Sequence, residues 1–481
     1  MGAIGGVRIR TGLGRTSVDP SVPTPGGPPR HGLRRALTAA GVVALAVVLL
    51  AVGGLGLFRG HPGAEQPAVP ALGTDPTGSL AGHPVILSGS LRQAIASLQA
   101  HLRDRPDDWP TWATLGLAYV QEARVSADPS YYPKAEGALR RSLRLQPDEN
   151  FEAFTGEGAL AAARHDFAGA LEWGRKARAV NPYNGNVYGV IGDAQLELGR
   201  YEEAFATFQH MVDLKPDLAS YARASYAREL QGDVAGAESA MRLALSAAGS
   251  PEDRAFAASQ LGDLAFNSGR LDDAEGYYRE AVAATPEYEP PHAGLARVAW
   301  ARGDVDGAIA RFSAIVARYP SPEYVIALGD LYAIAGRPSD AATQYATVRV
   351  EERLFAAAGV DTDLEVALFD ADHGSPTRAV AEATAEWGRR HGILVADALA
   401  WSLFKAGRAE EAMPYVELAR RLGYRSALLA FHAGMIERAT GDLTAARRDL
   451  RAAIHTNPHF SILYAEVARE ALAGLEGGAG R

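Results

Sequence analysis

The chain has 481 residues and no cysteine, which excludes disulfides, thiol catalysis and cysteine-bearing zinc sites. Its formal net charge is −9, and its arginines outnumber its lysines by 44 to 4, a bias that we attribute to a GC-rich bacterial genome. Residues 1–60 hold seven arginines and one acid, a net charge of +6, so residues 61–481 carry −15. An acidic body of this kind argues against nucleic acid and anionic lipid as its partners.

The N-terminal part of the chain predicts a membrane anchor. Residues 1–35 are rich in glycine, proline and arginine, a composition typical of a disordered basic tail. Residues 36–58 then form 23 consecutive positions without a charge, whereas a helix needs about 20 residues to cross a bilayer. We therefore expect one transmembrane helix over 36–58, followed by a linker rich in proline and glycine over 59–89.

The arginines around this segment predict its orientation. Arg30, Arg34 and Arg35 precede the segment closely, and only Arg59 follows it closely. The positive-inside rule then places the N-terminus in the cytoplasm and the rest of the chain outside the cell membrane. A cleaved signal peptide and the reversed orientation are the alternatives, but a signal peptide would usually have a shorter apolar core and a cleavage site of small residues.

Between residues 199 and 446 a glycine is followed five residues later by an alanine eight times, and successive pairs recur every 33 to 38 residues. A glycine can end a helix in the left-handed conformation, and the small alanine lets the next helix pack closely on its neighbours. Each pair therefore predicts two antiparallel helices joined by a tight turn. The pairs are Gly199/Ala204, Gly232/Ala237, Gly269/Ala274, Gly303/Ala308, Gly336/Ala341, Gly374/Ala379, Gly407/Ala412 and Gly441/Ala446.

Further positions repeat with the same register. A larger apolar residue lies one helical turn after most of the alanines, and four units have a proline twelve residues after the alanine: Pro216, Pro286, Pro320 and Pro458. Trp112, Leu115, Gly116 and Tyr119 supply the front half of the pattern in the first unit. Together these residues resemble the tetratricopeptide repeat, with its W-x-x-L-G-x-x-Y, A-x-x-x-F and P signature.

The resemblance predicts an all-α fold, an α-solenoid of about ten tetratricopeptide helix-turn-helix repeats that occupies residues 90–475 and is preceded by the transmembrane helix. We expect a leading helix over Leu91–Arg103, a capping helix over Ser461–Leu475 and a disordered tail over 476–481. The repeats should start near Trp109, Phe151, Gly185, Leu218, Ala255, Glu289, Pro322, Val360, Ile393 and Ala427.

Some intervals depart from the pattern. Residues 125–132 form an insertion that should lengthen the first turn, and Arg353 stands where a proline is expected. We expect a bend near residues 350–375. The solenoid should be least regular between Gly232 and Gly269 and between Gly336 and Gly374.

We find no catalytic grouping in this register, and we expect no enzyme activity, cofactor, metal or small-molecule substrate. Asp370, Asp372 and His373 are close enough to suggest a metal site, but we expect them to be solvated at a helix end before Gly374. His165 stands at an inter-helix turn, where it replaces the usual glycine.

The resemblance implies that the first helices of the repeats line a groove that holds a partner peptide or helix. Two groups of side chains occupy the family's groove positions. One is a mainly acidic strip that would suit a basic or amide-rich segment: Asp193, Glu197, Asp263, Arg297, Trp300 and Asp330. The other is an apolar groove in the last two repeats: Leu394, Trp401, Phe404, Leu428, Phe431 and Met435.

Both groups could instead be structural, because charges are common on solvated faces and the capping helix could cover the apolar residues. A clamp for acidic C-terminal tails, known in some members of the family, is absent, since the nearest positions hold Asn186, Gly189 and Asp193. We therefore expect a membrane-anchored scaffold that binds other proteins or peptides through its concave groove. The alternative is an assembly or secretion accessory that holds unfolded or extended clients in the cell envelope.

Overall fold

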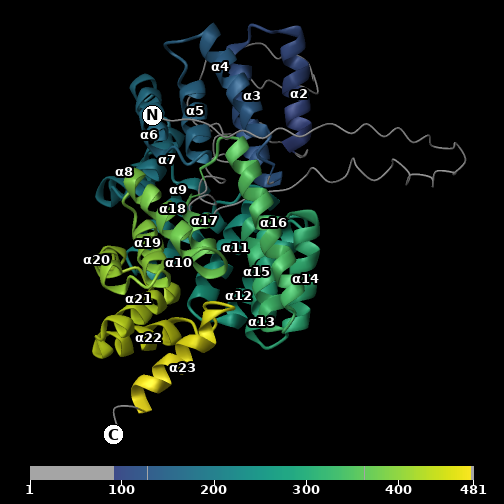
Figure 1. The fold of residues 1–481 in the computed structure, drawn as a ribbon. Coiled ribbons are helices and arrows are strands. Elements are labelled where there is room, and N and C mark those ends of the chain that lie inside the picture. Colours follow the sequence, from purple (N-terminus) through teal and green to yellow (C-terminus); the bar gives the residue numbers. More distant parts are fainter. Residues whose placement is uncertain (1–90, 127, 362, 478–481) are drawn as a thin grey trace, which may run out of the picture. The chain divides into compact units, whose positions relative to one another are not determined.

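The computed structural model describes residues 91–477 except residues 127 and 362, and all regular structure in this range is helical (Figure 1). Helices α2 (Leu91–Asp104) and α23 (Tyr464–Gly477) flank ten helix pairs. The first helices of the pairs are α3 (Trp109–Ser126), α5 (Phe151–Ala163), α7 (Gly185–Glu197), α9 (Leu218–Leu230), α11 (Pro251–Asn267), α13 (Glu289–Ala301), α15 (Pro322–Ile334), α17 (Asp363–His373), α19 (Ile393–Lys405) and α21 (Ala427–Thr440). The second helices are α4 (Tyr131–Leu145), α6 (Phe167–Val180), α8 (Tyr201–Leu214), α10 (Val234–Ser246), α12 (Leu271–Ala284), α14 (Val305–Arg318), α16 (Pro338–Ala357), α18 (Pro376–Arg389), α20 (Ala409–Arg420) and α22 (Leu443–Thr456).

Eight of the ten expected repeat starts coincide with the first residue of a helix. Helix α11 begins earlier than expected, at Pro251, because the Ser250 side chain caps it by accepting a hydrogen bond from the Asp253 N–H. Helix α17 begins after Val360, because Gly359 ends the preceding helix with a positive φ of 75°.

Seven of the eight repeat glycines have a positive φ, and Gly374 is the exception. At that turn the Gly374 N–H donates to the Asp370 carbonyl at 3.1 Å, and the Asp370 side chain accepts the Ser375 N–H at 3.3 Å. A carboxylate therefore closes this turn, and the left-handed glycine that we expected there is not needed. His165 replaces a turn glycine, as expected, and has a φ of 63°.

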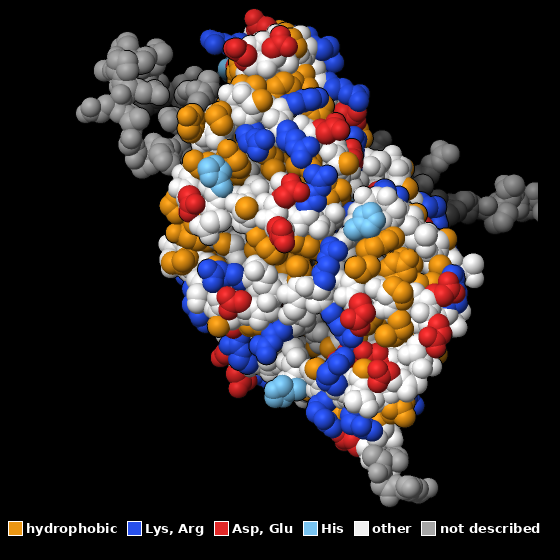
Figure 2. Space-filling view, turned by 90° about the vertical axis from the view of Figure 1, so that its left-hand side faces the viewer, with side chains coloured by type: hydrophobic (Ala, Val, Ile, Leu, Met, Phe, Trp, Pro, Cys, Tyr) orange, Lys and Arg blue, Asp and Glu red, His pale blue; other side chains and the backbone are white. Residues whose placement is uncertain are grey.

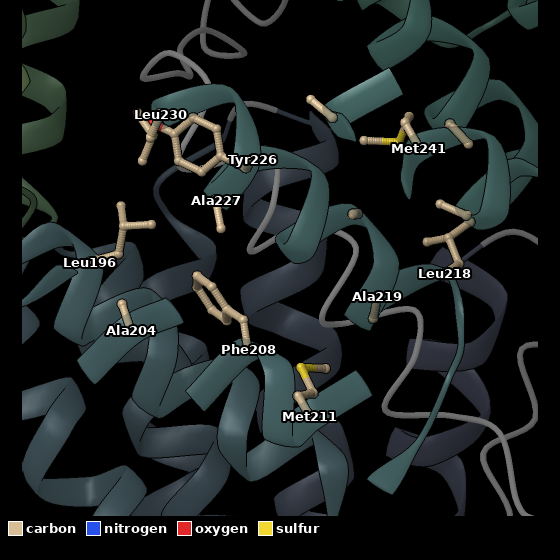
Figure 3. Close-up of a cluster of buried hydrophobic side chains, with 14 of the residues drawn as sticks. Leu196, Ala204, Phe208, Met211, Leu218, Ala219, Tyr226, Ala227, Leu230 and Met241 are labelled. Atoms are coloured by element: carbon tan, nitrogen blue, oxygen red, sulfur yellow. The ribbon is translucent and has the colours of Figure 1, made fainter. Parts of the chain in front are cut away.

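The repeats pack through glycines that make room for large side chains of the second helices. A Cβ added at Gly192 on α7 would lie 2.4 Å from the Phe208 ring, and one added at Gly262 on α11 would lie 2.5 Å from the Tyr278 ring. Phe208 belongs to a buried cluster that runs from α7 to α11 and includes Leu196, Met211 and Leu230 (Figure 3). Each repeat therefore buries its apolar face against the next one, as in a solenoid.

Two intervals depart from the regular repeat. Residues 125 and 126 of the 125–132 insertion extend helix α3, and residues 128–130 lie in the turn before α4, in agreement with the expected insertion. Helix α16 runs for 20 residues through Arg353, because no proline stops it. Its last turns bring Phe355 into a buried cluster with the first two repeats.

The superhelix completes one turn within the described residues and then contacts itself. The Tyr319 hydroxyl donates to the Arg124 carbonyl at 3.0 Å, across 195 residues. The Ile393 N–H donates to the Tyr201 hydroxyl at 2.8 Å across 192 residues, and Tyr424 lies 3.5 Å from Glu229 across 195 residues. Since the separations agree, about six repeats make one superhelical turn. We call α3–α14 the first turn and α15–α22 the second turn.

The segments 1–35, 36–58 and 59–89 lie outside the described residues, so the expected membrane anchor stays a prediction. Among the residues that are described, no helix combines the length and the apolar character that a membrane span needs.

Candidate protein-binding site

The apolar residues expected in the C-terminal groove lie under the last helix of the chain. Trp401 and Phe431 have exposed fractions of 2% and 0%, and the Tyr464 ring of α23 stacks on Phe431 with a centroid distance of 5.1 Å. Tyr464 also meets Trp401 edge to face at 5.4 Å. In this conformation the two aromatic residues are therefore core residues, because α23 covers them.

The remaining members of that group are less deeply buried. Phe404, Leu428 and Met435 pack as partly buried residues against the same cluster, and Leu394 packs against the cluster of the first turn. None of the six forms an open apolar groove on its own. The capping helix that we expected over Ser461–Leu475 accounts for this burial.

The acidic strip is largely neutralised by partners within the protein. Asp193 accepts two hydrogen bonds from Arg223, of 2.8 and 2.7 Å. Glu197 pairs with Arg390. Asp330 accepts a hydrogen bond of 2.9 Å from the Tyr345 hydroxyl and lies 3.1 Å from His373.

Asp263 and Arg297 form a pair that remains partly open to solvent. The Arg297 guanidinium donates to Asp263 at 2.5 Å and to the Tyr278 hydroxyl at 3.1 Å, and Tyr278 donates to Asp263 at 2.8 Å. The side chains of Arg297 and Asp263 are 30% and 18% exposed. Burial acts to lower the pKa of Arg297, but Tyr278 and Asp263 outweigh it and raise that pKa. The guanidinium is therefore a fixed positive charge. Trp300, one turn further along α13, meets His459 edge to face at 6.1 Å.

Two more carboxylates lie near this pair. Glu323 at the start of α15 is solvent-exposed. Its pKa is nevertheless raised, because desolvation by the surrounding protein and the Asp263 charge outweigh the opposite effect of Arg297. Burial, together with the Asp263 charge, raises the pKa of Glu229 to about 7. Asp263 and Glu323 thus both act on the Arg297 guanidinium, and the Asp263 charge also acts on Glu229. All four residues belong to first helices of their repeats, and we define Glu229, Asp263, Arg297 and Glu323 as the concave interior.

The group that resembled a metal site holds the second turn together, and it is not the solvated helix end that we expected. Asp370 has an exposed fraction of 1% and pairs with Arg349. Asp372 accepts hydrogen bonds from Trp401 at 2.8 Å and from the Tyr464 hydroxyl at 2.5 Å. Within the described ranges, no cluster of three or more potential metal ligands is present.

Several residues of these sites were not anticipated from the sequence. Arg223 and Arg390 fall outside the groove positions that the family pattern marks, whereas Glu323 occupies a marked position, the second of its repeat, but was not singled out. For Arg223 a signal did exist, because an arginine in the middle of the alanine-rich helix α9 needs a buried anion. The pairing of Arg390 depends on how the turns of the superhelix meet, which no local pattern reports.

Charged side chains of both signs occur on the outer surface. Figure 2 shows acidic, basic and apolar side chains interspersed over the face that it displays. Many of the charges on the second helices form pairs with the neighbouring repeat, such as Arg302 with Glu275 at 2.5 Å. This mixed surface is typical of a solvated face.

Comparisons with known proteins agree with the repeat pattern. Tetratricopeptide repeat models match residues 185–218, 265–331 and 398–459. A curated relative, the cellulose synthase 1 operon protein C of Komagataeibacter xylinus, is 29% identical over 203 residues. That stretch is 40% of this chain and 15% of the relative, so the chain matches only a small part of it.

Solved structures share the helical repeat with low sequence identity. PilF of Pseudomonas aeruginosa is 22% identical, with a TM-score of 0.33 over 45% of this chain and 94% of that chain. The human IFIT1 dimer with PPP-AAAA is 15% identical, with a TM-score of 0.42 over 76% of this chain and 86% of that chain.

Proposed function

This chain is a tetratricopeptide repeat protein, and we propose that it is a scaffold that binds a segment of another protein in the concave interior of its first superhelical turn. The observation that carries the proposal is the charge of that interior. Asp263 and Glu323 share Arg297, Glu229 lies near Asp263, and Glu323 and Arg297 remain accessible to solvent. A partner segment that brings basic or amide side chains would complete this arrangement.

The polar character of the interior favours an extended partner segment over an apolar helix. The large apolar groove positions of the last two repeats are covered by α23, so they offer no open surface for such a helix. An extended segment can present alternate side chains to Asp263 and Glu323. The proposed function is binding and includes no catalytic step.

We further propose that residues 36–58 anchor the scaffold in the cell membrane, with the N-terminus in the cytoplasm and the repeats outside. The uncharged run of 23 residues and the arginines before it support this placement. A reporter fused after Arg481 that is active only outside the cytoplasm is the expected result. A reporter active only inside would contradict it.

An assembly accessory for extended clients is the second candidate. One relative is named as a cellulose synthase operon protein. A client involved in polymer synthesis would reach this protein in the cell envelope, which favours the accessory role. Under this alternative the client leaves once it has folded or assembled. A permanent scaffold keeps its partner.

Charge variants of the interior test the proposed binding. We would compare the full chain carrying Asp263→Asn and Glu323→Gln with one carrying Asp272→Asn and Glu466→Gln, two carboxylates on second or capping helices outside the interior. The variant with Asp263→Asn and Glu323→Gln should co-purify at least about tenfold less cross-linked partner than wild type. Lowering the salt concentration should increase partner binding less in this variant than in wild type. Equal loss in both variants would contradict a specific interior site.

A further inference from the structure

The two superhelical turns meet at a buried arginine. Arg390, at the end of α18, pairs with Glu386 of the same helix and with Glu197 of α7, 193 residues away. Its side chain is 6% exposed, and those of Glu197 and Glu386 are 10% and 5% exposed. The guanidinium carbon lies 4.9 Å from the centre of the Phe167 ring on α6. One side chain therefore connects both turns.

The Arg390–Glu197 contact differs from the other contacts between the turns in the number of charges around it. Glu197, Glu386 and Glu365 of α17 all act electrostatically on Arg390, and Glu365 is also affected by the other two carboxylates. Without the guanidinium, three carboxylates from both turns would face one another in a poorly solvated space. Removal of one partner from a buried charge pair is strongly unfavourable, because the other charge is left uncompensated.

Most other hydrogen bonds between the turns use the backbone, and their donors and acceptors could return to water. The Asp361 N–H donates to the Arg164 carbonyl at 3.2 Å, and Arg421 donates to the Gly199 carbonyl at 3.4 Å. Apolar contact between the turns is also present, because Ile393 belongs to the buried cluster of the first turn and Phe355, Ala358 and Val360 belong to the buried cluster of the first two repeats.

We infer that Arg390 is a latch between the two superhelical turns, whose pairing with Glu197 holds them together and whose release lets them separate while each turn stays folded. The latch depends only on contacts between the turns and needs no partner. Separation of the turns would widen the route into the concave interior, so partner entry would be controlled at this point if the proposed binding is correct.

Two glutamates provide a matched pair of variants. Glu197→Gln removes the charge pair between the turns, whereas Glu386→Gln removes a pair within the end of α18. We would place spin labels on cysteines at Leu243 of α10 and Leu443 of α22, which are 51% and 48% exposed and lie on different turns. The chain has no native cysteine, so these would be the only labelled positions.

The full chain with Glu197→Gln should show a broader and longer distance distribution between the labels than wild type, with unchanged helical circular dichroism. Amide exchange of Ile393, which donates to Tyr201 across the same contact, should accelerate about tenfold or more. The Glu386→Gln variant should stay close to wild type in both measurements. An unchanged distribution and exchange rate in Glu197→Gln, or an equal change in Glu386→Gln, would overturn the latch.

A disulfide between the turns separates opening from unfolding. Cysteines at Arg164 and Asp361, whose backbones are hydrogen-bonded, would be close enough to oxidise. In the Glu197→Gln background this disulfide should restore slow exchange of Ile393, and its reduction should restore fast exchange. If exchange stays fast in the oxidised protein, the substitution has loosened the repeats themselves and the latch is wrong.

Discussion

Arg223 on α9 donates two hydrogen bonds, of 2.8 and 2.7 Å, to the carboxylate of Asp193 on α7. Both side chains are almost completely buried, with exposed fractions of 2% and 6%. The arginine reaches the aspartate across Gly189, whose missing Cβ would lie 3.2 Å from the guanidinium carbon. A position that the family pattern assigns to the groove is therefore a structural pair between two repeats. It explains why the expected acidic strip is not an open acidic surface.

Arg223→Met should destabilise the protein by about 3 to 5 kcal/mol, because it leaves the Asp193 charge buried without a partner. The double variant with Asp193→Leu should lose much less, since no uncompensated charge remains. Thermal unfolding followed by circular dichroism compares the three proteins. Equal losses in the single and double variants would show that packing, and not the unpaired charge, sets the cost.

Gly262→Ala should lower the stability by about 1 to 3 kcal/mol, because its methyl group would meet the Tyr278 ring at 2.5 Å. Gly276 provides a control, since a Cβ there meets nothing within 4 Å on the exposed side of α12. Gly276→Ala should stabilise the helix by about 0.5 to 1 kcal/mol. Opposite shifts of the unfolding temperature are expected, and a stabilising Gly262→Ala would contradict the described packing.

Glu351 should make the stability depend on pH. Neither of its carboxylate oxygens has a hydrogen-bond partner among the described residues, and burial raises its pKa from 4.5 to about 8. The folded state therefore holds this proton more tightly than the unfolded state, so stability falls as the pH rises from about 4.5 to 8. Glu351→Gln should remove this loss.

The Glu351→Gln variant should match wild type near pH 4 and be more stable by about 3 to 5 kcal/mol at most near pH 8.5. The exposed Glu252→Gln is a control that should leave the pH profile unchanged. Unfolding temperatures measured from pH 4 to 8.5 provide the comparison. Parallel profiles of wild type and Glu351→Gln would contradict the buried, protonated carboxyl group.

Tyr464→Ala should uncover Trp401, because the tyrosine ring lies on Trp401 and Phe431 and its hydroxyl donates to Asp372. We expect the tryptophan emission to shift to longer wavelength and its quenching by acrylamide to rise. Val467→Ala, on the 37% exposed side of the same helix, is the control. A quenching constant that Tyr464→Ala leaves unchanged would mean that α23 does not protect the apolar residues.

The sequence predicted the repeats well because their signals are local. The left-handed glycines and the small alanines act within a few residues, and a helix begins at the expected residue in most repeats. Gly374 shows the limit of such a rule, since the Asp370 carboxylate closes its turn by a different contact.

The candidate site was less predictable because it depends on how small rotations add up along the solenoid. The contact of Tyr319 with Arg124 and that of Ile393 with Tyr201 join residues more than 190 positions apart. No local pattern indicates where one superhelical turn meets the next. The register placed Asp263 and Arg297 in one strip of groove positions, and the structure pairs them. For Trp401 and Phe431 it left open whether they form a groove or lie beneath the last helix, and in the structure α23 covers them.

Site-specific photo-cross-linking tests the proposed binding most directly. A benzophenone amino acid at Tyr288, which lies near Asp263, would report on the concave interior of the full chain, and the same probe at the exposed Leu243 would report on the outer face. The account predicts protein adducts at position 288 that disappear with Asp263→Asn and Glu323→Gln and are absent at position 243. Adducts that form equally at both positions, or that survive the two charge substitutions, would contradict a partner site in the concave interior.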